Sequence, residues 1–125
     1  MGSPNPVSDA RSRLGRAGED TALAWYLGIG FELVARNWRC AAGELDLVLV
    51  RDGVLVFCEV KTRTGDGFGG GYEAVGWRKK RKLRQLAELF LAARGVVPAV
   101  VRFDVASVMA SPGAQPTVEV FQDAF

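Results

Sequence analysis

Two apolar runs separated by a turn signal form the clearest pattern in the chain. Residues 47–50 and 54–58 are apolar throughout, and Asp52-Gly53 between them is a pair that two-residue β-hairpin loops favour. If these two residues form the loop, Arg51 faces Val54, and the numbers of facing residues sum to 105. Because both faces of the runs are apolar near the turn, we expect a central hairpin that is covered on both sides.

Apolar residues at helical spacing predict one helix before this hairpin and one after it. The helices are predicted over residues 13–27 and 77–94, and a glycine follows each of them as a stop signal. The inner face of the first is predicted to consist of Leu14, Ala17, Thr21 or Ala22, and Trp25, widened by Leu23, Tyr26 and Leu27. The inner face of the second is predicted to consist of Leu83, Leu86, Phe90 and Ala93.

The strands complete the predicted architecture. They are expected over residues 31–40, 44–50, 54–62, 100–109 and 117–121. The order α-β-β-β-α-β-β predicts an α/β fold in which helices flank a mixed central sheet. A chain of 125 residues has the length of one domain. We assign that domain to residues 13–125, after a polar N-terminal tail, residues 1–12, that we expect to be flexible.

Composition and motifs indicate the cellular compartment of the protein. No segment approaches the roughly 20 apolar residues that a membrane span needs, so we expect no membrane partner. Residues 1–12 lack the apolar stretch of a signal peptide. Cys40 and Cys58 fall in predicted strands, and the chain has no histidine and no Cys-x-x-Cys pattern for zinc. These features favour a cytoplasmic protein with reduced cysteines.

Acidic residues occupy the open end of the predicted hairpin. Its register places Asp46 opposite Glu59, and Glu44 opposite Lys61. Cross-strand partners have Cβ atoms about 4.5–5.5 Å apart, and like charges at that separation are destabilising unless a positive charge lies between them. A divalent cation would supply that charge. The alternative interpretation is a solvated sheet face on which these residues are merely polar.

The acids suit a particular chemistry. Asp46 and Glu59 are hard oxygen ligands for Mg²⁺ or Mn²⁺, and the Val60 carbonyl is a further candidate ligand. Such an ion would polarise a scissile phosphate and lower the pKa of a bound water. Lys61 would position that water or stabilise charge on the phosphate. The alternative for Lys61 is a plain salt bridge to Glu44, which is itself a weaker candidate for the site.

Glu19 on the first predicted helix is a further candidate. The alternative is an ordinary acidic side chain on a solvated helix face. Gly18 beside it lacks a side chain and would permit close approach of helix and sheet. Glu19 would then reach the open end of the hairpin as a third carboxylate ligand and catalytic residue.

Basic residues are concentrated in one part of the chain. Residues 76–102 carry eight basic and one acidic side chain, although the whole chain has a net charge of only +2. Such clustering is typical of a surface that binds a polyanion, and the alternative is a solvated helix face. The candidate nucleic-acid-binding residues are Arg63, Arg78, Lys79, Lys80, Arg81, Lys82 and Arg84, with Gln85 as a weaker candidate.

Two neighbouring features have alternatives of their own. Trp77 could stack on a base or cap the core, and we favour the core. The glycine-rich residues 65–71 lack the Gly-Lys-Ser/Thr of a Walker motif, so we interpret them as a flexible flap over a groove.

Four motifs together carry a family resemblance. They are Gly43-Glu44-Leu45-Asp46, Glu59-Val60-Lys61-Thr62-Arg63, Glu73-Ala74-Val75 and Arg102-Phe103-Asp104-Val105. From about Gly15 to the end, the chain resembles the YraN-like family of small uncharacterised bacterial proteins. That family is similar in turn to the PD-(D/E)xK nuclease superfamily, which has a restriction-endonuclease-like fold and includes archaeal Holliday junction resolvases and RecB-type nuclease domains.

The resemblance implies an αβββαβ core with the acidic cluster on its second and third strands. It assigns metal binding to Asp46 and Glu59, the superfamily lysine to Lys61 and the first-helix glutamate to Glu19. Leu45 stands where the wider superfamily has proline. Gln85 echoes only part of the Gln-x-x-x-Tyr motif of RecB-type nucleases.

These observations predict a Mg²⁺- or Mn²⁺-dependent DNA endonuclease, which could select its substrate by structure. One acid pair per chain suits cleavage of a single strand, so a double cut or a four-way junction would require a homodimer. The first alternative is a non-catalytic nucleic-acid-binding module or adaptor on a nuclease fold. The second is an RNA nuclease, because nothing in the sequence separates RNA from DNA, although we favour DNA as the partner.

Overall fold

The fold of the chain, taken from a computed structural model, is described for residues 6–64 and 76–125, with side chains from residue 13 onward. The predicted flap at residues 65–71 and the motif Glu73-Ala74-Val75 lie outside the described residues. The elements are α1 (Pro6–Gly28), β1 (Glu32–Cys40), β2 (Gly43–Arg51), β3 (Val54–Thr64), α2 (Trp77–Arg94), β4 (Val100–Ala110) and β5 (Thr117–Phe121).

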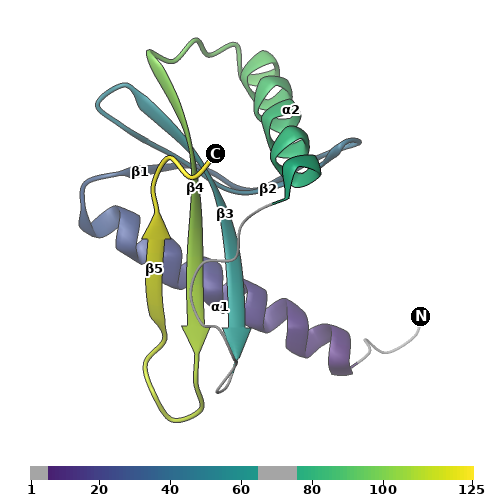
Figure 1. The fold of residues 1–125 in the computed structure, drawn as a ribbon, viewed down its shortest axis with the longest axis vertical. Coiled ribbons are helices and arrows are strands. Elements are labelled where there is room, and N and C mark those ends of the chain that lie inside the picture. Colours follow the sequence, from purple (N-terminus) through teal and green to yellow (C-terminus); the bar gives the residue numbers. More distant parts are fainter. Residues whose placement is uncertain (1–5, 65–75) are drawn as a thin grey trace.

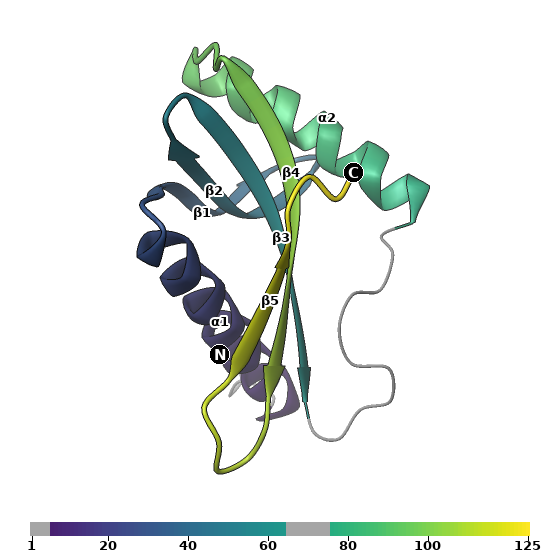
Figure 2. The same ribbon diagram turned by 60° about the vertical axis from the view of Figure 1, so that its left-hand side comes forward.

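One mixed sheet separates the two helices. Its strand order is β1-β2-β3-β4-β5, and every neighbouring pair is antiparallel except β3 and β4, which are parallel. Parallel neighbours need a crossover connection, and α2 lies in the one that joins β3 to β4. Helix α1 packs on one face of the sheet and α2 on the other (Figures 1 and 2). The predicted α/β class, with helices flanking a mixed sheet, is confirmed.

The central hairpin has the predicted register. Arg51 pairs with Val54, and the pairing continues with the same sum as far as Leu47 and Cys58. Asp52 and Gly53 both have positive φ, of 50° and 80°, as the two central residues of a type I′ turn require. The loop chemistry therefore fixes which residues of β2 and β3 lie side by side.

The core has two parts, one on each face of the sheet. On the α1 side, Ala22 and Tyr26 pack against residues that include Leu47 and Val56. On the α2 side, four helix residues pack against the opposite face of the same strands; they are Leu83, Leu86, Ala87 and Phe90. Burial on both faces explains why β2 and β3 are apolar at successive positions. The expectation of a covered central hairpin is confirmed.

Helix faces were the least accurate part of the prediction. Helix α1 begins at Pro6, inside the segment expected to be a tail. Among residues 13–28 of this helix, the buried ones are Gly18, Glu19, Ala22 and Tyr26, whereas Ala17 is exposed. The inner face is therefore rotated from the predicted one, because a glycine and a carboxylate occupy two of its positions. In α2, Ala87 takes the place predicted for Ala93, which is exposed.

The sheet divides halfway along β3. Past Leu47 and Cys58, β2 remains paired with β1 as far as Gly43, whereas β3 remains paired with β4 as far as Thr64. Figure 1 shows β1 and β2 leaving the direction of β3, β4 and β5. The predicted acids at the open end of the hairpin lie at this division.

Candidate functional site

Asp46 lies on β2 at the point where the sheet divides. The backbone N–H of Val60 on β3 donates to Asp46 Oδ2 at 2.9 Å, so a side chain makes the link between the two strands here. Side-chain alternation also changes at this residue. Leu45 belongs to the core under α2 and Leu47 to the core under α1, although a regular strand would direct both to one face. The face of the sheet to which alternate β2 side chains point therefore switches at Asp46.

Three carboxylates meet at this place. Glu19 of α1 and Glu44 and Asp46 of β2 each offer an oxygen, and these oxygens all lie within 4.8 Å of one another. Gly18 explains how the helix comes so near, because a Cβ at this position would overlap the Thr62 hydroxyl on β3. The expected close approach of helix and sheet is therefore present, and Glu19 is buried rather than solvated.

Two donors from β1 hold Glu19. Arg36 Nε lies 3.3 Å from Glu19 Oε1, and Asn37 Nδ2 donates to the same oxygen at 3.1 Å. Asn37 has a positive φ of 53°, which lets consecutive residues of one strand aim donors at a single carboxylate. Arg36 also binds Asp20 at 2.7 Å, which ties β1 to α1.

Arg36 and Asn37 were not among the predicted site residues. The signal for them is a polar pair in the middle of a strand, together with the tolerance of asparagine for the left-handed region and its poor fit to a strand.

Burial and neighbouring charge act together on Asp46. Desolvation, followed by the negative charge of Glu59, raises the pKa of the Asp46 carboxyl to about 7, and Glu19 and Glu44 contribute further. The hydrogen bond from Val60 opposes the shift. A carboxyl that is hard to ionise for these reasons would be relieved by a nearby cation.

Glu59 approaches the division from the other side. Its carboxylate lies 3.1 Å from Lys79 Nζ on α2, and its side chain is only 12% exposed. Glu59 is therefore not one of the three close carboxylates. Among the neighbouring charges, it nevertheless contributes most to the raised pKa of Asp46. Lys61 lies two residues further along β3 and so shares the Glu59 face. Among the described residues, the Lys61 side chain has no hydrogen-bond or ion-pair partner, although its backbone pairs with β4.

Glu44 has a different partner from the one considered for it. Its Oε2 lies 3.0 Å from Arg39 Nε of β1, and Arg39 is its cross-strand neighbour in the sheet. The salt bridge between Glu44 and Lys61 is not formed, because β2 and β3 have already separated at Glu44.

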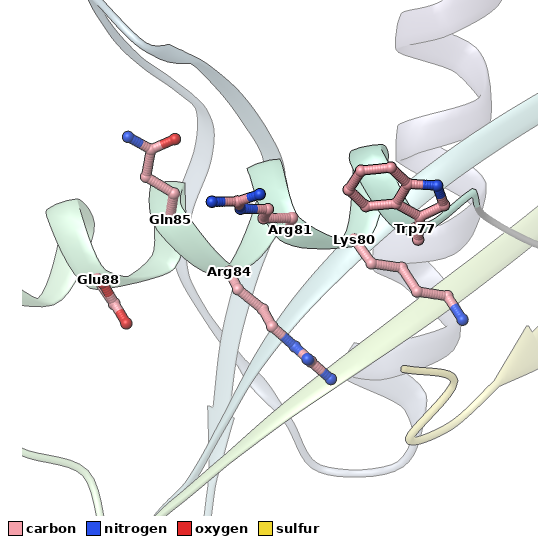
Figure 3. A pocket seen from close by; sticks show the side chains of 6 residues that line it. All are labelled: Trp77, Lys80, Arg81, Arg84, Gln85 and Glu88. Atoms are coloured by element: carbon pink, nitrogen blue, oxygen red, sulfur yellow. The ribbon is translucent and has the colours of Figure 1, made fainter.

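Basic side chains line the solvent side of α2. An open hollow of about 530 Å³ is lined by Trp77, Lys80, Arg81, Arg84, Gln85 and Glu88 (Figure 3). Lys82 lies instead beside Gly43 at the start of β2. Arg63 is half-buried on β3. The predicted basic residues thus extend over more than one side of the helix.

Trp77 corrects one expectation. Its side chain is 66% exposed, so it does not cap the core. The guanidinium carbon of Arg78 lies 5.4 Å from the centre of the Trp77 ring, a cation–π arrangement. Trp77 is the first residue of α2 and lies on the side opposite to the buried stripe. It is therefore not at a position that helical periodicity assigns to the core.

Comparison with known proteins identifies a family. The model of the uncharacterised protein family UPF0102 matches residues 18–108. A UPF0102 protein of Parafrankia sp. (strain EAN1pec) is 47% identical over 113 residues, which cover 90% of this chain and 96% of the relative. A UPF0102 protein of Frankia alni is 49% identical over 117 residues, covering 93% and 97%. One of Mycolicibacterium smegmatis is 44% identical over 110 residues, covering 86% and 89%.

The family match includes the acids of α1, β2 and β3 and the whole of α2. The resemblance to YraN-like proteins is thereby confirmed at the level of the family. In the part of the chain that the structure describes, neither helix has the length and apolar character of a membrane span.

Proposed function

Because the chain belongs to the uncharacterised protein family UPF0102, its activity has to be argued from its own site, and we propose that it is a metal-dependent DNA endonuclease. One observation carries the proposal. Carboxylates of α1 and β2 converge where the sheet divides, and the half-buried Asp46 among them has a raised pKa, to which the charge of Glu59 on β3 contributes. Negative charge concentrated in this way is what a divalent cation would stabilise.

The residues present fit Mg²⁺ or Mn²⁺. Carboxylates and backbone carbonyls are the hard oxygen donors that these ions prefer, and the described part of the chain brings no sulfur or nitrogen ligand into the acidic trio. Asp46, Glu19 and Glu59 would hold the ion, with Glu44 and the Val60 carbonyl as further donors. When bound, the ion would polarise the scissile phosphate and lower the pKa of its water.

The remaining residues would act on the substrate. Lys61 would stabilise charge on the phosphate, because it lies on the same face of β3 as Glu59. The cations of α2 and Arg63 would bind neighbouring phosphates and make affinity fall as salt rises. Arg36 and Asn37 would keep Glu19 oriented, since both donate to the same oxygen.

Cleavage and ion binding test the proposal together. We would incubate the protein with single-stranded, flap, duplex and four-way-junction DNA plus Mn²⁺, and measure Mn²⁺ binding by calorimetry. Asp46→Ala and Glu59→Ala should abolish cleavage and weaken Mn²⁺ binding, because each removes a proposed ligand. Lys61→Ala should abolish cleavage and leave Mn²⁺ binding in place.

The matched control is Glu32→Ala, which removes an exposed carboxylate of β1 that lies opposite Val50, at the other end of β1 from the pair Arg39 and Glu44. It should retain both cleavage and Mn²⁺ binding. Wild-type protein that binds no Mn²⁺, or variants that bind it as well as the wild type does, would overturn the metal site.

A nucleic-acid-binding module is the second candidate, and the contact between Lys79 and Glu59 favours it. In this arrangement a lysine already neutralises one of the proposed ligands. Protein that binds DNA in a salt-dependent way but cuts none of the four substrates in Mg²⁺ or Mn²⁺ would support the module. The same substrates made of RNA would separate the remaining alternative, an RNA nuclease.

A further inference from the structure

The outward face of α2 combines flat apolar surface with positive charge. Six residues at intervals of three and four positions line the hollow there; they are Trp77, Lys80, Arg81, Arg84, Gln85 and Glu88. The buried stripe of the helix lies on its other side. Figure 3 shows the indole of Trp77 at one end of this row and the carboxylate of Glu88 at the other. This solvent-facing side of α2 therefore combines an exposed aromatic ring with charged side chains.

Trp77 has no role in the core. At 66% exposed, it is the one aromatic ring among the large exposed apolar side chains of the described residues. Exposed aromatic surface is favourable to bury, and an indole also attracts other flat rings by stacking. Arg78 contacts the ring through its guanidinium group, which adds positive charge next to the flat surface. A ligand that fits this end therefore has a planar group and negative charge.

The charge of the hollow selects the rest of the ligand. Lys80, Arg81 and Arg84 outnumber the single acid, Glu88, so a polyanion is favoured. With a rise of about 1.5 Å per residue, Arg81 and Arg84 lie about 6 and 10 Å along the helix from Trp77. A nucleic-acid strand advances by about 3.4 Å per nucleotide in a duplex, so this length corresponds to a few nucleotides.

Stacking distinguishes single strands from duplexes. In a duplex each base face is covered by the neighbouring base pair, so an indole outside the helix has no face to stack on. In a single strand the bases are available, and aromatic side chains of binding proteins use them irrespective of sequence. Phosphate contacts alone would explain the arginines and lysines but would leave the exposed tryptophan without a use.

We propose that the hollow on α2 binds a single-stranded segment of nucleic acid, with one base stacked on Trp77 and phosphates at Lys80, Arg81 and Arg84. This inference rests on the proposed function and names the substrate class, a nucleic acid with an unpaired strand. Lys79, the neighbour of Lys80, touches Glu59 at 3.1 Å, so a strand in the hollow lies within one helical turn of the acidic site.

A binding experiment without cleavage tests the stacking. In EDTA, fluorescence anisotropy would measure affinity for three labelled probes: a 12-nucleotide oligothymidylate, an abasic 12-mer with the same phosphates, and a 12-base-pair duplex. Wild-type protein should bind oligothymidylate about tenfold or more tightly than the abasic strand, which is the range expected for one stacked base. Trp77→Ala should abolish that difference and leave abasic affinity unchanged. Trp77→Phe should retain part of it.

The matched control is Leu89→Ala, which removes an exposed apolar side chain from the same helix outside the hollow. It should bind all three probes as the wild type does. Equal loss of affinity for all probes in Trp77→Ala, or equal binding of thymidylate and abasic strands by the wild type, would overturn the stacking and leave the nuclease proposal standing. Wild-type protein that binds none of the probes would overturn the assignment of the hollow, whereas the cleavage and Mn²⁺-binding measurements decide the nuclease proposal separately.

Discussion

Two aspartates of the same sheet have opposite surroundings. Asp104 on β4 is fully buried and is surrounded by donors: Tyr26 Oη at 2.6 Å, Arg102 Nε and Nη2 at 2.9 Å, and the backbone N–H of Asp123 at 2.9 Å. Asp46 on β2 accepts one backbone hydrogen bond and otherwise faces the negative charges of Glu19, Glu44 and Glu59.

This difference separates a carboxylate that stabilises the fold from one that we propose to bind a metal ion. The charge of Asp104 is compensated by its own chain, and Arg102 responds with a raised pKa, chiefly because it donates to Asp104. The charge of Asp46 is opposed by its own chain. A fold that keeps such a residue carries a cost in the isolated protein, and a bound cation is the partner that would offset it.

The largest expected effect comes from breaking the compensated site. Asp104→Ala should lower the free energy of unfolding by about 3–5 kcal/mol, because it leaves the partly buried Arg102 and the fully buried Tyr26 without their acceptor. It should leave Mn²⁺ binding per folded molecule unchanged, since Asp104 is not in the acidic trio. Urea denaturation and calorimetry measure the two quantities.

Tyr26→Phe is the matched control, because it removes one of these donors and keeps the ring. It should cost only about 1 kcal/mol, the usual net worth of one hydrogen bond. A loss of less than 1 kcal/mol in Asp104→Ala would show that the network around Asp104 contributes little to stability.

Removing the charge of Asp46 should have the opposite effect and raise the free energy of unfolding. In EDTA, Asp46→Asn should be more stable than the wild type at pH 8, by about 4 kcal/mol at most, since the pKa of Asp46 rises from 3.8 to about 7 and one pKa unit is about 1.4 kcal/mol. The carboxyl of Asp46 ionises near its usual pKa of 3.8 in the unfolded chain but near 7 in the folded protein. Between these values unfolding releases a proton, so wild-type stability falls as pH rises from about 4 to 7.

The comparison between the two proteins isolates this residue from the other titrating groups. Urea denaturation at intervals from pH 4 to 8 should show a difference that is near zero at pH 4 and grows towards pH 7. Asparagine can still accept the hydrogen bond from Val60, so the link between the strands is preserved. A difference that stays constant with pH would mean that the charge of Asp46 is not opposed in the folded protein.

Much of the fold could be predicted because its signals are local. Asp52-Gly53 specifies a two-residue turn, and that turn alone determines the register of β2 and β3. Helix faces were predicted less well, because periodicity follows apolar residues. The buried face of α1 includes Gly18 and Glu19, which are not apolar side chains. The spacing of apolar residues therefore favoured a neighbouring face of the helix over the one that is buried.

The candidate site depends on contacts that sequence cannot supply. The register brought Asp46 to the level of Glu59, but the separation of β2 from β3 there follows from how each strand pairs with its other neighbour. The contact between Lys79 and Glu59 joins residues 20 positions apart, and only the packing of α2 determines it.

The smallest expected effect concerns the residue that holds Glu19 in place. Asn37→Gly keeps the left-handed backbone and removes only the amide that donates to Glu19 Oε1 at 3.1 Å. Stability should change by about 1 kcal/mol or less, whereas Mn²⁺ affinity should fall about tenfold, because donors behind a ligand orient it. Calorimetric titration with Mn²⁺ measures this change, and unaltered affinity would show that Arg36 alone orients Glu19.

Asn37→Ala separates the amide from the backbone. Alanine lacks the amide and is also strained at positive φ, so it should be less stable than the glycine variant and bind Mn²⁺ equally weakly. If only the alanine variant loses affinity, the backbone conformation rather than the amide positions Glu19. In that case strand geometry would determine how close the carboxylates lie to Asp46. The donors of β1 would then have a structural role, like the donors that surround Asp104.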